Sequence, residues 1–262
     1  ILVGIKDDKG TDSIYHGDNF ESTNEPITKG LDGLYERCIE YRKNGAKFTK
    51  WRCVFKINHP NRPSKLAIEL NANVLAQYAS ISQAAGLVPI VEPDVLMDGS
   101  HDLDTTHKCC REIMAAVIKK LHDFNVYMGG MLIKTNMILP GIQCSIQYSN
   151  EEIAQATVTF LAETVPPAIP GVVFLSGGLD EIRATTLLNC INKTTTSKYW
   201  KLSFSFGRAL QHSVLLAWNG NAENAPKAQE VLLTRAKANS NATNGKYKIE
   251  NKLNNITYIY NK

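Results

Sequence analysis

The sequence predicts an α/β fold with a parallel sheet, because short apolar runs alternate with longer amphipathic segments along the chain. The runs are rich in Val, Ile, Leu and Phe, as expected for strands that are buried on both faces. They cover residues 1–6, 48–57, 87–92, 130–134, 171–176 and 202–206. The segments between them predict helices over 31–44, 71–85, 107–123, 150–163, 180–191 and 209–218, and a longer helix over 223–239.

Local signals support several of these helices. The segment 107–123 has apolar residues at helical spacing, namely Ile113, Met114, Val117, Ile118 and Leu121. Asn150 is a favourable N-cap residue and is followed by two acidic residues, which suit the first turn of a helix. Gly45 and Gly86 follow two predicted helices and fit helix C-terminal stops.

A strand followed by a helix, repeated along the chain, is the pattern of a (β/α)8 TIM barrel. Six such units do not close an eight-stranded barrel, and the difference is two units, or about 60 residues at about 30 per unit. Because Ile1 opens the chain inside a strand-like run, we expect the first two βα units to be missing from this sequence. We assign 1–239 to an N-terminally incomplete barrel and the Asn-rich segment 240–262 to a C-terminal tail.

The composition argues against some classes of function. The chain of 262 residues is 44% hydrophobic and 21% charged, which is ordinary for a globular protein. Its net charge of +4 is not gathered into a basic block, so nucleic acid is not a predicted partner, whereas an anionic small molecule would fit. No apolar run reaches the roughly 18 residues of a membrane span, so no membrane partner is predicted.

The cysteines indicate a reducing compartment. They are Cys38, Cys53, Cys109, Cys110, Cys144 and Cys190, and none belongs to a CxxC pair. Neither a disulfide framework nor a zinc ribbon is predicted from this spacing. The first residues show no signal-peptide pattern, and we therefore expect a cytoplasmic protein.

Polar side chains follow the predicted strands where each strand ends. In chain order they are Lys6, Lys50 and Arg52, Glu92, Lys134, Ser176 and Arg208. The C-terminal strand ends of a βα barrel converge on one mouth, where active sites lie, so we expect these side chains to gather there. Lys50 and Arg52 are two residues apart and should face the same side of their strand.

Lys134 is the strongest candidate for chemistry. A lysine amine that is buried near other cations, such as Lys50, has a lowered pKa, and the neutral amine attacks carbonyl groups. The position therefore predicts a Schiff-base lysine, with Glu92 as its acid–base partner. The alternatives are a lysine that extends its charge into solvent at the mouth of the barrel, and a structural ion pair for Glu92.

Glycine-containing turns follow the last two predicted strands. The first holds Ser176, Gly177 and Gly178, and the second holds Gly207 and Arg208. In barrels these turns often bind phosphate through backbone N–H groups and a helix N-terminus, and an arginine can bind it bidentately. We therefore predict a phosphate site; the alternative is a pair of ordinary βα turns with an exposed arginine.

The segment 98–107 is rich in histidine and aspartate. It includes Asp98, His101, Asp102, Asp104 and His107. These residue types can bind metal, but the segment fits better as a polar loop that leads into the N-cap of the following helix. No metal or other cofactor is predicted.

Several stretches of the chain together closely resemble class I fructose-bisphosphate aldolase. They are LVGIKDDKG (2–10), GLDGLYERC (30–38), FTKWRCVFKI (48–57), LVPIVEPDVL (87–96), DGSHDL (98–103), ETVPPAIPGVVFLSGG (163–178) and WKLSFSFGRALQ (200–211). This family cleaves fructose 1,6-bisphosphate reversibly to dihydroxyacetone phosphate and glyceraldehyde 3-phosphate, through a lysine imine and without a metal.

The resemblance implies a role for each matched residue. Lys134 would be the Schiff-base lysine, Glu92 the acid–base residue and Lys50 an assistant in imine chemistry. The implied substrate-binding residues are Arg52, Lys6, Ser176, Gly177, Gly207 and Arg208. The family normally ends in a tyrosine that reaches over the site, and Tyr260 is the candidate here. A homotetramer is also implied.

Some positions depart from the family pattern. An aspartate on the first barrel strand has no counterpart in this sequence, and substitutions occur at Asp94, Gly129, Thr135, Ala162, Glu163 and Leu179. The sequence therefore leaves two interpretations open. One is a glycolytic aldolase; the other is a truncated, inactive aldolase-like chain that acts as a binding or structural partner. A divalent-metal aldolase is a more remote third, which insensitivity to EDTA would dismiss.

Overall fold

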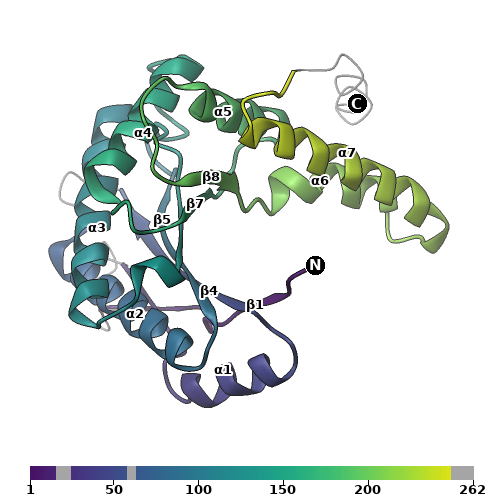
Figure 1. The fold of residues 1–262 in the computed structure, drawn as a ribbon. Coiled ribbons are helices and arrows are strands. Elements are labelled where there is room, and N and C mark those ends of the chain that lie inside the picture. Colours follow the sequence, from purple (N-terminus) through teal and green to yellow (C-terminus); the bar gives the residue numbers. More distant parts are fainter. Residues whose placement is uncertain (16–24, 58–62, 249–262) are drawn as a thin grey trace.

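The computed structural model describes residues 1–15, 25–57 and 63–248, which form one main sheet with helices along its outer side (Figure 1). The sheet has six parallel strands in the order β1-β4-β5-β6-β7-β8. These strands are β1 (Gly4–Lys6), β4 (Phe48–Lys56), β5 (Val88–Leu96), β6 (Leu132–Thr135), β7 (Gly171–Phe174) and β8 (Lys201–Phe204). A small antiparallel pair, β2 (Thr11–Ser13) and β3 (Pro26–Thr28), follows β1.

A helix follows each strand of the main sheet from β4 onward. The helices are α1 (Leu34–Lys43), α2 (Lys65–Ala84), α3 (Leu103–Asp123), α4 (Asn150–Thr164), α5 (Glu181–Lys193), α6 (Arg208–Trp218) and α7 (Ala225–Thr243), with short 3-10 turns at Met128–Gly130 and Ala222–Asn224. The strand order and the helices on one side confirm the predicted barrel-type α/β fold.

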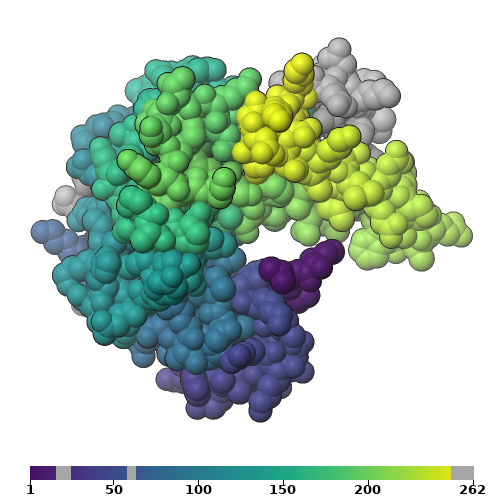
Figure 2. All heavy atoms as spheres, in the orientation of Figure 1, coloured from purple at the N-terminus to yellow at the C-terminus, as the bar shows by residue number. Residues whose placement is uncertain are grey.

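The sheet curves but is open. Over the described residues, β1 and β8 are its two edges. Figure 2 shows the atoms as an arc, in which a notch separates the purple N-terminal residues from the yellow-green atoms of α6 and α7. The concave side of this arc carries the polar residues considered below.

Strand β4 shows how the core and the concave side are separated. Its residues alternate between buried and half-buried along the whole strand. Trp51, Cys53 and Phe55 are at most 1% exposed and pack in the main core beneath the helices. Lys50 and Arg52 fall on the opposite face because side chains alternate along a strand. The prediction that these two residues share a face is confirmed.

Several predicted boundaries were wrong, and local hydrogen bonds explain the observed ones. Helix α2 begins at Lys65 rather than at 71, because the hydroxyl of Ser64 accepts the N–H of Ala67 at 3.1 Å. Helix α3 begins at Leu103, after an Asp102 cap that accepts the N–H of Thr105 at 2.8 Å.

Helix α4 is capped by Ser149 rather than by Asn150. The Ser149 hydroxyl accepts the Glu152 N–H at 3.2 Å, and the Glu152 carboxylate accepts the Ser149 N–H at 2.7 Å, which forms a capping box. Asn150 is the first helical residue.

The C-terminal helix also extends beyond its predicted end. Helix α7 runs to Thr243, so residues 240–243 of the segment assigned to a tail are helical. Tyr247 is 7% exposed, and its N–H donates to the side-chain oxygen of Asn189 at 2.9 Å. Residues 249–262, including Tyr260, lie outside the described residues.

Candidate active site

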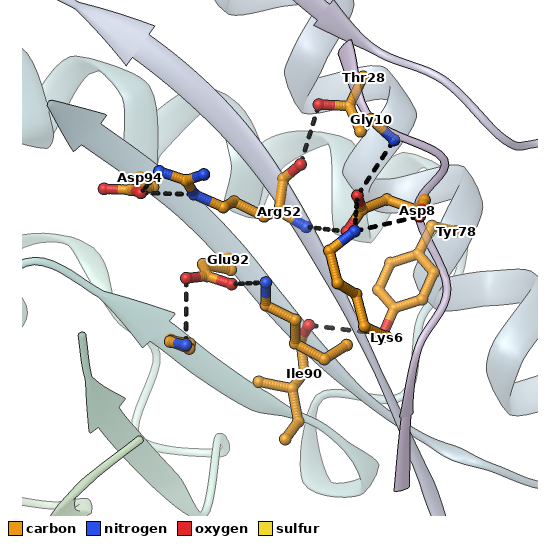
Figure 3. Close-up of polar contacts among 11 residues, drawn as sticks. Lys6, Asp8, Gly10, Thr28, Arg52, Tyr78, Ile90, Glu92 and Asp94 are labelled. Atoms are coloured by element: carbon orange, nitrogen blue, oxygen red, sulfur yellow. Dashed lines mark hydrogen bonds and ion pairs between the residues drawn. The ribbon is translucent and has the colours of Figure 1, made fainter. Parts of the chain in front are cut away.

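The structure places Glu92 between two lysines on the concave face of the sheet. Glu92 Oε2 lies 2.5 Å from Lys50 Nζ, and Glu92 Oε1 lies 3.2 Å from Lys134 Nζ. The Glu92 side chain is 3% exposed, and those of Lys50 and Lys134 are 19% and 13% exposed. One carboxylate therefore contacts two amines, and all three side chains are mostly buried. Figure 3 marks both contacts of Glu92 with dashed lines.

The strand register brings these residues together. Lys50, Glu92 and Lys134 lie on the successive neighbours β4, β5 and β6, and Arg52 is paired in register with Glu92. In contrast to the prediction, Lys50 and Glu92 lie within long strands rather than at their ends, because β4 and β5 remain paired as far as Lys56 and Leu96. A cluster on adjacent parallel strands is held by backbone ladders on a rigid scaffold.

The Lys50–Glu92–Lys134 cluster can move protons. A carboxylate within hydrogen-bond distance of an amine can donate or accept a proton as the amine reacts. A second amine, that of Lys50, lies 2.5 Å from the same carboxylate, so a proton can pass between Glu92 and either lysine. The arrangement suits addition of the Lys134 amine to a carbonyl group, followed by loss of water.

Arg52 is bound by the carboxylate of Asp94, a position that departs from the family pattern. Arg52 Nε and Nη2 both lie 2.6 Å from Asp94 Oδ2, and Asp94 is 5% exposed. The other Asp94 oxygen accepts from Asn136 Nδ2 at 3.3 Å. Asn136 also bonds the backbone N–H and carbonyl of Val95, at 2.8 and 2.7 Å, and so connects β5 to the segment after β6. No sequence signal indicated that Asn136 belongs to this group.

Two carboxylates after β1 point to different partners. Asp8 lies 2.5 Å from Lys6 Nζ, and its other oxygen accepts the backbone N–H of Arg52 at 3.3 Å (Figure 3). Asp7 is 3% exposed and accepts from the thiol of Cys38 in α1 at 3.3 Å. Burial raises the pKa of the Asp7 carboxyl, against the opposing effect of the Cys38 hydrogen bond.

The side chain of Lys6 is 56% exposed, so the cation sits at the accessible rim beside the buried cluster. An exposed ammonium group at this place can bind an anionic ligand. Lys6 is paired in register with Lys50 of β4, so their side chains fall on the same face of the sheet, and Figure 3 shows Lys6 near the backbone of Arg52.

The two predicted phosphate turns leave neighbouring strands. Strands β7 and β8 pair in register from Gly171 with Lys201 to Phe174 with Phe204, and the N–H of Ser205 continues this pairing to the Phe174 carbonyl at 2.9 Å. Gly177 has a φ of 54°, a conformation that favours glycine. Added bulk there would meet the Met97 sulfur at 3.1 Å.

Each phosphate turn leads directly into a helix. After Ser176 and Gly177 comes α5, and Gly207 is the N-cap of α6, whose first residue is Arg208. Free backbone N–H groups and the positive end of the helix dipole favour an anion at such places. The two turns are therefore adjacent candidates for one phosphate group.

The side chains of the histidine-rich segment 98–107 contact different partners and do not converge on one point. Glu163 Oε2 lies 3.7 Å from His107 Nε2 and 3.7 Å from Arg111 Nη1. Asp104 pairs with Lys108 at 2.6 Å, and burial lowers the pKa of His101. Among the residues that the structure describes, no group of three or more His, Cys, Asp and Glu side chains could hold a metal ion.

Two further features concern the cysteines and the helices. All six cysteines are free thiols. Within the described ranges, none of the helices combines the length and apolar character that a membrane crossing requires.

Comparisons with known proteins all point to one enzyme family. The family model described as Fructose-bisphosphate aldolase class-I matches residues 1–261. The chain is 54% identical to aldolase C of Rattus norvegicus over 247 residues, which are 94% of this chain and 66% of that protein. It is 53% identical to the muscle-type aldolase of Lethenteron camtschaticum over 248 residues, 95% of this chain and 67% of that one. The chain thus spans about two thirds of the length of these relatives.

A solved structure gives the same picture for the fold. Fructose-bisphosphate aldolase from Plasmodium falciparum, crystallised in complex with TRAP and a small molecule inhibitor, has a TM-score of 0.91 and 47% sequence identity to this chain. The match covers 95% of this chain and 71% of the other.

Proposed function

Because the chain belongs to the class-I fructose-bisphosphate aldolase family, we propose that it catalyses the reversible aldol cleavage of fructose 1,6-bisphosphate through a Schiff base on Lys134. The products are dihydroxyacetone phosphate and glyceraldehyde 3-phosphate. The observation that carries the proposal is the position of Glu92, whose two carboxylate oxygens contact Lys50 and Lys134.

Imine formation requires two proton transfers, and the cluster supplies a group for both. The neutral Lys134 amine attacks the C2 carbonyl of the ketose, and a proton moves from the resulting ammonium nitrogen to the alkoxide oxygen to give a neutral carbinolamine. The carbinolamine hydroxyl then leaves as water after a second protonation. Glu92, 3.2 Å from the Lys134 nitrogen, can deliver that proton, and the adjacent Lys50 stabilises the carboxylate that results.

Carbon–carbon cleavage follows from the charge of the iminium group. As the C4 hydroxyl loses its proton, the C3–C4 bonding electrons move into the iminium, and the aldehyde product leaves. The remaining enamine takes a proton at C3 to regenerate the iminium. Addition of water then releases the ketone and restores the lysine.

The cations on the two edges of the sheet suit a substrate with a phosphate at each end. Lys6 ends β1, which is one edge strand, and Arg208 follows β8, which is the other. We assign the ketose phosphate to Ser176, Gly177, Gly207 and Arg208, and the other phosphate to Lys6. Arg52 lies between the two sites and can contact the substrate chain.

Borohydride trapping with dihydroxyacetone phosphate, followed by peptide mass spectrometry, tests the lysine. The reduced adduct is expected on Lys134 in the unchanged chain and absent from a Lys134→Ala variant. Lys198→Ala is the matched control, because Lys198 is a half-buried lysine that donates to the Thr194 carbonyl at 2.6 Å, away from Glu92. An adduct that persists in Lys134→Ala would refute the assignment.

A cleavage assay then separates the two interpretations that the sequence left open. Release of glyceraldehyde 3-phosphate from fructose 1,6-bisphosphate, measured with a coupling dehydrogenase, would support an aldolase. A folded chain that binds the sugar phosphate but releases no product would instead favour the inactive, aldolase-like binding protein.

Assembly and location remain predictions that rest on the family. We expect a homotetramer in the cytoplasm, and the six free thiols are consistent with a reducing compartment. Light scattering coupled to size-exclusion chromatography would give the number of subunits directly.

A further inference from the structure

Arg235, near the middle of α7, is a buried cation that the proposed reaction does not use. Its side chain is 2% exposed. A guanidinium group is costly to remove from water unless its N–H groups are hydrogen-bonded, so a buried arginine of this kind requires a structural reason. Burial lowers the pKa of Arg235, and the neighbouring Glu181 carboxylate opposes that effect.

A single nitrogen of Arg235 contacts two other helices. Arg235 Nη2 donates to the Glu181 carbonyl at 2.6 Å and to the Thr185 hydroxyl at 2.9 Å, both in α5. It also lies 3.3 Å from the carbonyl of Ala209, the second residue of α6. Arg235 therefore joins the first turns of α5 and α6 from its position on α7.

The Glu181 side chain completes this connection. Its Oε2 lies 3.8 Å from Arg235 Nε, and its Oε1 accepts from the N–H and the hydroxyl of Ser213 in α6, at 3.1 and 3.0 Å. Thr185 is also bonded to Asn239, one turn after Arg235, at 2.9 Å. Five side chains, those of Glu181, Thr185, Ser213, Arg235 and Asn239, thus hold α5, α6 and α7 in a fixed arrangement.

The helices that Arg235 joins are the two that follow the phosphate turns. Glu181 is the first residue of α5 and comes three residues after Gly178, and Ala209 comes directly after Arg208. Figure 1 shows α7 beside α6, with its C-terminal part next to α5. A shift of α5 relative to α6 would separate the two turns.

We propose that Arg235 is a positioning residue for the phosphate site, because it fixes the turn at 176–178 relative to Arg208. This inference rests on the proposed function. A planar guanidinium can reach acceptors on two helices at once, whereas a methionine of similar length fills the space without donating. Loss of the guanidinium should therefore loosen the phosphate site while the Glu92–Lys134 pair on β5 and β6 remains in place.

Borohydride trapping with two ketones separates these effects. Dihydroxyacetone phosphate and dihydroxyacetone would both form an imine on Lys134, but only the first has a phosphate. In Arg235→Met, the half-saturating concentration of dihydroxyacetone phosphate should rise by about tenfold to a hundredfold, on the scale of a misplaced binding group. That of dihydroxyacetone should not change.

Arg183→Met is the matched control. Arg183 is a second arginine with a helix-joining contact, but it lies on α5 and its guanidinium donates to the Asn150 side chain of α4. We expect unchanged half-saturating concentrations for both ketones in this variant.

Each outcome decides the inference. A rise for dihydroxyacetone phosphate alone, in Arg235→Met alone, supports it; no rise, or an equal rise for both ketones, overturns it. If Arg235→Met does not fold by circular dichroism, Arg235→Lys, which retains the charge and fewer contacts, is judged by the same criterion. No trapping by the unchanged protein would refute the proposed function, and the inference would fall with it.

Discussion

Replacing Glu92 with glutamine removes the negative charge between two lysines while the side chain keeps its shape. At an effective dielectric constant of about 20, a pair of unit charges 3.2 Å apart, the separation of Glu92 and Lys134, attracts by roughly 5 kcal/mol. Desolvation of both groups offsets part of that attraction. Because Lys50 and Lys134 retain 19% and 13% of their side-chain exposure, we expect a net loss of about 2–4 kcal/mol in the free energy of unfolding.

The same substitution should slow imine formation by about a hundredfold or more, the usual contribution of a positioned acid–base group. Urea denaturation gives the loss of stability, and quenched-flow borohydride trapping gives the rate. Glu163→Gln is the matched control, because Glu163 is 38% exposed and its contacts to His107 and Arg111 are both 3.7 Å long. An imine rate in Glu92→Gln within threefold of the unchanged protein, taking roughly threefold as below 1 kcal/mol, would refute the acid–base role.

Two further predictions concern other parts of the mouth. Arg208→Ala should weaken binding of dihydroxyacetone phosphate by about 1.5–3 kcal/mol, the scale of a charged hydrogen bond, and an unchanged dissociation constant by calorimetry would remove Arg208 from the site. Asp7→Asn should stabilise the protein at neutral pH, because burial raises the folded-state pKa of Asp7 above its ordinary value of 3.8. In the unchanged protein, the neutral Asp7 carboxyl stabilises the fold at low pH, and this contribution is lost as pH rises from about 3.8 through the folded-state pKa. The gain in free energy of unfolding in the variant should therefore vanish near pH 4 and grow toward neutrality. Urea denaturation that shows an equal difference between the two proteins at every pH would contradict the prediction.

The sequence was informative where a feature depends on local periodicity. The alternation in β4 predicted that Lys50 and Arg52 share a face, and glycines after α1 and α2 predicted helix ends: Gly45 and Gly86 have φ values of 99° and 77°. These features require only the geometry of one strand or one helix terminus.

The strand predicted over 87–92 was too short, because β5 continues through Pro93 to Leu96. Proline lacks an N–H group and is unfavourable inside a sheet. The ladder between β5 and β6 covers only Ile90 and Val91, so beyond Glu92 the strand is paired on the β4 side alone. Pro93 is therefore tolerated, and this could be seen only from the pairing of three strands.

The partners of Arg52 could not be predicted for a related reason. Asp94 lies 42 positions from Arg52 in sequence, and Asn136 lies 42 from Asp94, so both contacts depend on the register between strands. Hydrophobic periodicity shows which face a residue occupies but not which residue it meets across the sheet. The same holds for Arg235, whose partners on α5 and α6 are set by how three helices pack.

The alternation of buried and half-buried residues along β4 has a consequence for how the sequence of this protein can evolve. Positions that face the helices, such as Trp51 and Cys53, are constrained by the volume of the core, while Lys50 and Arg52 are constrained by the carboxylates that they contact. A substitution on the concave side therefore changes the ion pairs of the proposed site without leaving a cavity in the core. Selection on the proposed site and selection on core packing can thus act on alternate residues of one strand.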